Sequence, residues 1–478
     1  MTHVNRSGAL RQSNGMNRRY TGSPASLRQR NHQSQSTQGC AGRGRHRTRC
    51  RLRQGGDQMM LIAAFFALVF VYSLVSRRLE RTVITAPILF TLLGVLMSFS
   101  HEALTELAMD RKDLLVIAEL GLVMTLFTDA ARVRPRMLKG DTNLPVRLLT
   151  VGMLLTIVLG MLGAVVVVRS LTWWEAGILA AILAPTDAGL GQAIVSSPRV
   201  PRRIRQALNV EAGLNDGLSV PFLMFFIALA QARETGAGGS VLARFLMEQL
   251  GYGTLIGVGV GLIGGWLLGL AQRKAWMAVP LTQLGVVALP IACVLASEAS
   301  GASMFIAAFV AGLATQAGFS EVGKHSVEFT EDWGQLLNYF VFFLFGLLIT
   351  LVWKQFDFAI VAYALLSLTL IRMIPVALAL RGTHLSKPTV LFMAWFGPKG
   401  LASIVLGLVY LEGETNLPGE TTIKLIVMAT VLLSILAHGI SALPAINRYT
   451  RAIAALGDDA PEHETVEMDR ASAGTNSA

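Results

Sequence analysis

Apolar residues in this chain occur in long blocks that are separated by short polar or charged connections. A hydropathy window of about 19 residues separates thirteen blocks that are long enough, or nearly so, to cross a bilayer as helices. The blocks cover residues 59–76, 84–99, 114–131, 148–168, 173–195, 205–230, 251–271, 279–297, 302–316, 336–352, 358–380, 388–411 and 422–446. The pattern predicts an all-α polytopic membrane protein with about 13 transmembrane helices, numbered below as spans one to thirteen.

The composition agrees with this prediction. Of the 478 residues, 53% are hydrophobic and 15% are charged, and the mean hydropathy is +0.54. Because about a quarter of the residues of a soluble domain are charged, a soluble fold is excluded. The three cysteines, Cys40, Cys50 and Cys293, match neither a zinc pattern nor a disulfide framework.

Polar segments flank the membrane domain at both ends. Residues 1–58 contain twelve arginines and no acidic residue before Asp57, and their Ser, Gln and Gly content predicts disorder. The same charge pattern occurs in nucleic-acid-binding arms, but we expect no nucleic-acid partner. We therefore predict a disordered extension (1–58), a membrane domain (59–450) and a flexible cytoplasmic tail (451–478).

The basic connections follow the odd-numbered spans, whereas the alternate connections are neutral or acidic. Because Lys and Arg are retained on the cytoplasmic side, we predict a cell-membrane protein with a cytoplasmic C-terminus and the start of span one outside. This orientation puts the Arg-rich extension outside, against the same rule. We hypothesise that translation begins at Met59 or Met60, which mass spectrometry would refute by detecting residues 1–58.

Two spans carry helix-breaking residues near their centres. In span five, Pro185 removes a backbone donor, and the glycines that follow weaken the helix. Span twelve contains the sequence GPKG at 397–400. Each break also carries a charge, Asp187 in span five and Lys399 in span twelve. We expect two discontinuous helices; the alternative is that these residues only reflect the higher frequency of Gly and Pro in membrane helices.

The two broken helices are seven spans apart, and such pairs are typical of the inverted repeats of transporters. We assign two inverted six-helix repeats to spans two to seven and eight to thirteen, with span one extra. Backbone freed at a break is tolerated at membrane depth only where it lines a cavity or is buried in protein. The breaks in helices five and twelve therefore predict a transport site near the midplane.

Span six contains two carboxylates, Glu211 and Asp216. A charged side chain near the bilayer centre costs about 2.5–3.5 kcal/mol on insertion scales, so a function is expected for them. Glu211 and Asn215 are four residues apart and share one helix face. Hard cations prefer oxygen ligands, which Asp216, Asp187 and the backbone carbonyl of Thr186 would supply.

Two cations inside the membrane need partners. Arg372 lies eight or more residues from the nearest end of span eleven, too deep to reach water, and Glu211 is its candidate anion. Lys399 needs a partner as well. The alternative is that these charges only fix the register of the helices, and we favour this role for the pair of Glu211 and Arg372. A purely structural role is less favoured for Asp187 and Asp216, because Arg372 and Lys399 do not obviously neutralise both aspartates.

At these residues the sequence resembles the monovalent cation:proton antiporter-1 family, the sodium/proton exchangers of the NhaP type. The resemblance runs over most of 59–450 and rests on APTD in span five, EAGLND in span six, Arg372 in span eleven and GPKG in span twelve. LFTDA in span three, ASEASGASMFIAAFVAGL across spans eight and nine, and LAHG in span thirteen support it. The order of these motifs within thirteen spans is more specific than any one of them.

The resemblance implies an antiporter that exchanges a monovalent cation, Na⁺ first and K⁺ or Li⁺ as alternatives, for protons without a cofactor. It implies that Asp216 binds the ion or proton beside Asn215, that Asp187 and Thr186 complete the site, and that Glu211 pairs with Arg372. The Asn-Asp pair is the family's mark of electroneutral one-for-one exchange. A homodimer with span one at its interface is also implied.

Three residues depart from the family pattern. Ala212 stands where many members carry a serine that binds the ion, TDA replaces the common TDP, and Lys399 replaces a usual arginine. The missing hydroxyl leaves potassium open as the substrate. The alternatives to antiport are a cation channel and a non-transporting cation or pH sensor. No HExxH or GxSxG occurs in the spans, so an intramembrane enzyme is not expected.

Overall fold

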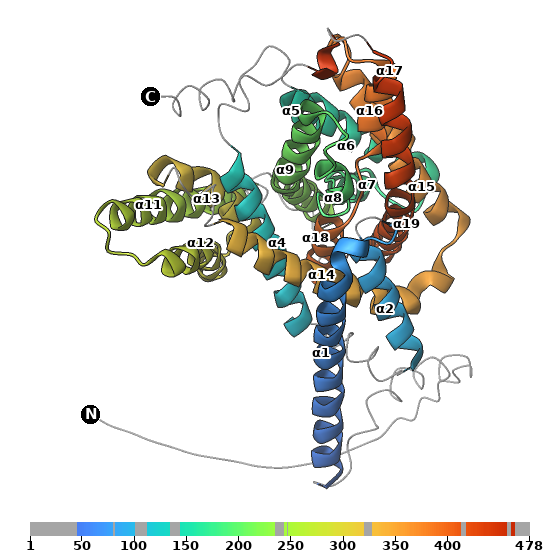
Figure 1. The fold of residues 1–478 in the computed structure, drawn as a ribbon. Helices are drawn as coiled ribbons and strands as arrows, with labels where there is room; N and C mark the ends of the chain where they lie inside the picture. Colours follow the sequence, from blue (N-terminus) through green and yellow to red (C-terminus); the bar gives the residue numbers. More distant parts are fainter. Residues whose placement is uncertain are drawn as a thin grey trace, which may run out of the picture. The chain divides into compact units, whose positions relative to one another are not determined.

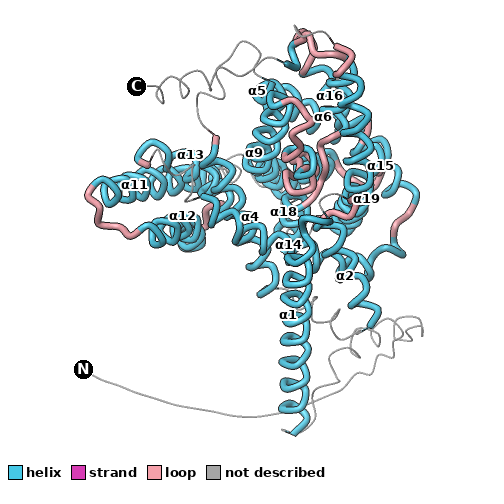
Figure 2. Tube along the Cα trace, viewed as in Figure 1, coloured by secondary structure: helices cyan, strands magenta, loops and turns pink. Residues whose placement is uncertain are grey.

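A computed structural model describes residues 45–79, 82–100, 112–133, 144–234, 243–245, 247–319, 327–412, 417–456 and 460–463 of the chain. The chain divides into two compact units, Met1–Met59 and Met60–Ala478. Of the first unit only the beginning of one helix is described, so the account below concerns the second. Every element in the described residues is a helix, and the connections that the structure describes between helices are loops and turns (Figures 1 and 2).

Each of the thirteen apolar blocks contains helix. Spans one to seven consist of α1 (Arg45–Leu79), α2 (Ala86–Ser100), α4 (Lys112–Arg132), α5 (Leu144–Arg147) with η2 (Leu148–Gly152) and α6 (Met153–Val167), α7 (Trp173–Ile182) with α8 (Gln192–Val195), α9 (Arg202–Glu234), and η3 (Met247–Tyr252) with α11 (Gly253–Arg273). Spans eight to thirteen consist of α12 (Val279–Ser300), α13 (Met304–Gly318), α14 (Val327–Val352), α15 (Phe358–Leu368) with α16 (Leu370–Ala379), α17 (Lys387–Trp395) with α18 (Leu401–Glu412), and α19 (Glu420–Ile453). The short helices η5 (Trp353–Gln355) and η6 (Pro461–His463) follow α14 and α19.

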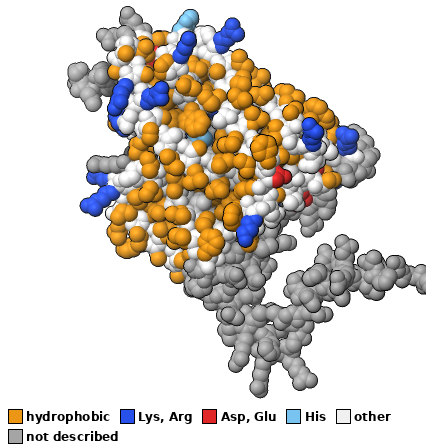
Figure 3. Space-filling model, turned by 90° about the vertical axis from the view of Figure 1, so that its right-hand side faces the viewer, with side chains coloured by type: hydrophobic (Ala, Val, Ile, Leu, Met, Phe, Trp, Pro, Cys, Tyr) orange, Lys and Arg blue, Asp and Glu red, His pale blue; other side chains and the backbone are white. Residues whose placement is uncertain are grey.

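Eight helical segments of the described residues are long and apolar enough to cross a membrane. They are Leu61–Leu79, Leu144–Val167, Arg202–Arg233, Ala243–Arg273, Leu281–Ser300, Phe329–Gln355, Phe358–Ala379 and Glu420–Ile453. Shorter apolar helices account for spans two, five, nine and twelve, and those of spans five and twelve are halves of interrupted helices. Span three is α4, a helix of 21 residues that carries several charged side chains. Hydrophobic side chains cover most of the described surface in Figure 3, as expected of a surface in contact with lipid. The prediction of an all-α polytopic membrane protein is confirmed.

The helix neighbours repeat along the chain at an offset of seven spans. Helix α6 packs against α7 and α7 against α9, and in the same way α16 packs against α17 and α18 against α19. Likewise α2 packs against α14, and α4 against α13. This offset pairs spans one to six with eight to thirteen, so the expected grouping of two to seven with eight to thirteen is wrong by one span. An odd offset also reverses the direction of each paired helix in a chain that crosses alternately, as inverted repeats require.

Several helix boundaries differ from the sequence prediction: α14 begins at Val327 instead of 336, α19 ends at Ile453 instead of 446, and two further differences change the interpretation. Helix α1 begins at Arg45, so residues 45–58, which were expected to be disordered, are helical. Arg and Leu are strong helix formers, and the apolar part of the helix supplies a nucleus from which it extends. Span eleven is interrupted at Thr369, three residues before Arg372, whereas a continuous helix was expected. The predictions for residues 1–44 and 464–478 lie outside the described residues.

Candidate functional site

The two breaks predicted from Pro185 and from GPKG both occur. After α7 ends at Ile182, the chain has no regular structure through 185–187 and becomes helical again at Gln192. After α17 ends at Trp395, residues 396–400 have no regular structure until α18 begins at Leu401. Pro185 and Pro398 cannot donate a backbone hydrogen bond, which explains why both helices stop here.

The two breaks cross and are joined through Asp187. The backbone N–H of Asp187 donates to the carbonyl of Pro398 at 2.8 Å. One carboxylate oxygen, Oδ2, accepts from Leu401 N at 2.6 Å, and Oδ1 accepts from Leu190 N at 3.1 Å. Asp187 therefore places its negative charge at the N-terminus of α18, where free N–H groups and the helix dipole favour an anion.

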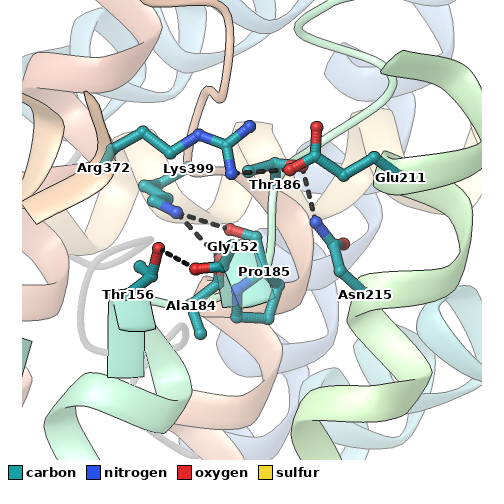
Figure 4. A network of polar contacts seen from close by, with 9 residues as sticks. All are labelled: Gly152, Thr156, Ala184, Pro185, Thr186, Glu211, Asn215, Arg372 and Lys399. Atoms are coloured by element: carbon teal, nitrogen blue, oxygen red, sulfur yellow. Dashed lines mark hydrogen bonds and ion pairs between the residues drawn. The ribbon is translucent and has the colours of Figure 1, made fainter. Parts of the chain in front are cut away.

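Lys399 occupies the same crossing from the other side. Its side chain is fully buried, and Nζ donates to the carbonyls of Ala184 at 2.9 Å and Pro185 at 3.1 Å (Figure 4). These carbonyls follow the C-terminus of α7, a position that favours a cation. The partners of Lys399 among the described residues are thus backbone carbonyls. The sequence did not identify them, because main-chain acceptors leave no pattern in the residue types.

Helix α9 brings the residues of span six to this crossing. Asn215 Nδ2 donates to Thr186 Oγ1 at 2.7 Å, so α9 is tied to the break in span five (Figure 4). Asp216 is only 6% exposed, and its Oδ1 has no hydrogen-bond partner among the described residues. An unpartnered carboxylate oxygen in a buried position is costly. Oδ1 of Asp216 can therefore accept a proton or a cation.

The second carboxylate of α9 has a partner. Arg372 Nη1 lies 2.6 Å from Glu211 Oε1, and the two side chains are 2% and 3% exposed. Gly397 lies close to this pair, since a Cβ there would come within 2.7 Å of Arg372 Cζ. The break in span twelve can therefore approach the guanidinium only because it carries glycine.

A small cavity opens beside the crossing. Its free volume of about 20 Å³ exceeds the volume that one water molecule needs. The lining residues are Thr186, Asp187, Ala188, Gly191, Ile194, Val195, Leu208, Ala212, Phe396 and Pro398. Ala212, one of the departures from the family pattern, thus forms part of the cavity wall, where a serine would add an oxygen.

Other polar residues support the breaks without belonging to the cavity. Ser434 Oγ of α19 accepts from Lys399 N at 2.7 Å, and His438 Nε2 lies 3.0 Å from the carbonyl of Trp395 at the end of α17. Asp129 lies next to the Cβ position of Gly213, while Arg132 pairs with Glu331.

Crossed interrupted helices in a polytopic bundle, with buried charges at the crossing, define a secondary transporter. Comparison with known proteins agrees. The sequence profile described as "Sodium/hydrogen exchanger, transmembrane" matches residues 62–448. The chain therefore belongs to the sodium/hydrogen exchanger family, and the resemblance drawn from the motifs is confirmed. The members of this class are transporters and not enzymes.

Three relatives define the similarity further. The K(+)/H(+) antiporter NhaP of Alkalimonas amylolytica is 25% identical over 392 residues, 81% of this chain and 66% of that protein. The uncharacterized Na(+)/H(+) exchanger YjcE of Escherichia coli is 31% identical over 179 residues, 35% of this chain and 32% of that protein. The chain thus spans less than two thirds of the length of either relative. The structure of the sodium proton antiporter MjNhaP1 from Methanocaldococcus jannaschii at pH 8 has the same fold, with a TM-score of 0.64 and 21% identity over 82% of this chain and 99% of that one.

Proposed function

We propose that the protein is a secondary active antiporter that exchanges a monovalent cation for protons by alternating access. The observation that carries the proposal is the buried Asp216, whose Oδ1 lacks a partner among the described residues. Asp216 lies next to Asn215, which is bonded to Thr186 in the break of span five. A carboxylate in this position is stabilised either by a proton or by a cation, and it cannot bind both.

Exchange follows from this competition. At a proton-poor face Asp216 loses its proton and binds the cation, with Asp187 and Thr186 as further oxygen ligands. At a proton-rich face the proton displaces the cation. Each loaded form has less uncompensated charge than the empty site, so the empty site crosses the membrane slowly and the two movements are coupled. One carboxylate that alternates between one proton and one monovalent cation makes the exchange electroneutral and one-for-one.

The remaining charges have structural roles in this proposal. The ion pair of Glu211 and Arg372 is internally neutral, so neither group is available to the transported ion. Lys399 holds the two breaks together through the carbonyls that follow α7. The moving unit contains spans five, six, eleven and twelve, which rock against the rest of the bundle.

The transported cation is Na⁺ in our first assignment, with K⁺ and Li⁺ as alternatives. Relatives with both names occur, a K(+)/H(+) antiporter among the sequences and a sodium proton antiporter among the structures. Ala212 in the cavity wall removes one oxygen that a small cation would use, which favours testing K⁺ beside Na⁺. We also propose a cell-membrane location, a cytoplasmic C-terminus, an outside N-terminus, and a homodimer with α1 at its interface.

Everted vesicles that contain a pH-sensitive dye test the proposal. After acidification of the lumen, Na⁺, Li⁺ or K⁺ is added in a titration, and dequenching of the dye measures proton release. The proposal predicts dequenching by at least one of these ions, unchanged when the membrane potential is clamped. Cation flux without proton counterflow would instead assign a channel. Cation binding without either flux would assign a sensor.

A further inference from the structure

The short helix η6, which follows the last membrane helix, returns to the bundle. Glu462 in this helix is only 2% exposed, although it belongs to a polar, acidic tail. Its Oε1 accepts hydrogen bonds from Ser386 N at 2.8 Å and from Thr389 Oγ1 at 2.7 Å. The neighbouring carbonyl of Pro461 accepts from Arg203 Nη1 at 2.6 Å. One turn of the tail thus binds two transmembrane helices.

The first of these helices is α17, and the contact is at its N-terminus. Ser386 is the N-cap residue of α17, but its side chain makes no capping hydrogen bond. Glu462 supplies the negative charge that this end of a helix favours. Thr389, which is fully buried, also lies 3.1 Å from Tyr449 Oη of α19, whose ring stacks on Phe392 at 4.2 Å. The carboxylate therefore links the tail with α17 and α19.

The second helix is α9, which begins at Arg202 and carries Asp216. Helix α17 leads directly into the break at 396–400. Its nine residues form a rod of about 13 Å, so a shift of its first turn is transmitted to the break. There, the carbonyl of Pro398 binds Asp187 N. The tail segment thus joins α9, which carries Asp216, to α17, which leads to Pro398 and its hydrogen bond with Asp187.

The interrupted helix of span five is joined to a neighbouring segment in a similar way, at the first turn of α7. Glu175 of α7 is 1% exposed and forms a capping box with Thr172. Its Oε1 also accepts from Gly419 N at 2.6 Å, at the start of α19. At the start of both α7 and α17, the first halves of the two crossing helices, a buried glutamate therefore joins the helix to a neighbouring segment. In α7 the glutamate belongs to the helix, whereas in α17 it comes from the segment after the last span.

We propose that Glu462 is a positioning residue of the transport site. Residues 460–463, called the strap below, fix α17 relative to α9 and thereby hold the break of span twelve where it binds Asp187. This inference rests on the proposed function. It adds to the transport unit a segment that lies outside all thirteen spans, and it assigns that segment an effect on cation affinity.

The hydrogen bonds that Glu462 accepts from Ser386 and Thr389 persist throughout the neutral pH range. Burial raises the pKa of Glu462, but hydrogen bonds from Ser386 and Thr389 outweigh it and hold that pKa below its ordinary value of 4.5. The stability that a lowered carboxyl pKa provides is present above the ordinary pKa and is lost only as the pH falls through the lowered one. The contact therefore acts as a permanent tie and not as a switch at neutral pH.

The test compares full-length variants in everted vesicles and in amide hydrogen exchange. Glu462→Ala should raise the KM for the cation about tenfold, equivalent to about 1.4 kcal/mol, with the maximal rate within twofold of wild type. It should also speed hydrogen exchange in the first turn of α17. Glu462→Gln, which keeps an acceptor oxygen, should have a smaller effect on both. Asp357→Ala is the matched control, because Asp357 is also an acidic residue at a helix start and caps α15, in a different span, through Ile360 N at 2.8 Å.

A second variant tests whether the effect passes through this contact. Thr389→Val removes one donor to Glu462 and should raise the KM as well, and the double variant should show less than the sum of the two free-energy changes. A KM within twofold of wild type in Glu462→Ala, or unchanged hydrogen exchange in α17, would overturn the proposal. If the wild type shows no exchange of cations for protons, the proposed function fails instead, and hydrogen exchange still decides whether the strap holds α17.

Discussion

Substituting Gly400 by alanine adds a single carbon atom, Cβ, where the two breaks cross. A Cβ at this position would lie 2.7 Å from Asp187 Cγ and 2.8 Å from Leu190 Cδ1. Ordinary contacts begin at 3.4 Å, so the carboxyl carbon must shift by at least about 0.7 Å. Because Asp187 Oδ2 is only 2.6 Å from Leu401 N, such a shift stretches or breaks the hydrogen bond that joins the breaks.

The magnitude follows from these distances. Overpacking of this kind costs typically about 1–3 kcal/mol, and every 1.4 kcal/mol corresponds to a factor of ten. We therefore expect cation affinity in Gly400→Ala to fall by about 5- to 140-fold. Gly407→Ala, in the helix α18 that follows Gly400, is the matched control, because its Cβ would approach nothing closer than Val427 Cγ1 at 3.3 Å. It should change affinity by less than twofold.

Dye dequenching in everted vesicles, titrated with the cation, gives the apparent affinity of both variants. Thermal unfolding in detergent reports whether each variant is folded. A Gly400→Ala protein that is folded and retains wild-type affinity would refute the reasoning, since it would mean that the position of Asp187 does not determine cation binding. Equal losses in both alanine variants would refute it too, because the effect would then follow from alanine itself.

Three further predictions concern the charges and the cavity. Lys399→Met should lower stability by about 1–3 kcal/mol, because it leaves two buried carbonyls without a donor, and thermal unfolding measures this loss. Arg372→Met should destabilise by about 3–5 kcal/mol, because it leaves Glu211 buried and unpaired; adding Glu211→Gln should recover most of the loss in a double-mutant cycle, and full additivity would contradict the pair. Ala212→Ser should raise the apparent affinity for Na⁺ relative to K⁺ in the vesicle titration, and an unchanged ratio would remove Ala212 from the explanation of ion preference.

Much of the fold could be predicted from the sequence because lipid imposes strong constraints. A membrane helix must be apolar over a fixed length, so all thirteen segments were visible in the hydropathy pattern. Pro185 and GPKG located both breaks, since proline removes a donor and glycine weakens a helix. The repeat boundaries were wrong by one span, because hydropathy places helices along the chain and does not reveal which helices are neighbours.

The contacts at the site were less predictable. The pairing of Arg372 with Glu211 could be inferred because a buried charge needs an opposite charge. The carbonyl partners of Lys399 could not, since every residue has a carbonyl. Glu175 was missed although TWWE at 172–175 has the spacing of a capping box. Glu462 was missed because it lies among other acidic residues of a polar tail, and only the fold brings it to α17.

Proton release on cation binding tests the central claim most directly. Purified protein in weakly buffered detergent solution is mixed with the cation, and a pH indicator counts the protons released per site. The account predicts release of about half a proton per bound cation at the pH at which Asp216 is half protonated, rising toward about one at lower pH, where nearly every site carries a proton before the cation binds. It predicts none in Asp216→Asn, while the control Asp357→Asn behaves like wild type. Cation binding without proton release by the wild type, or equal release by Asp216→Asn, would contradict it.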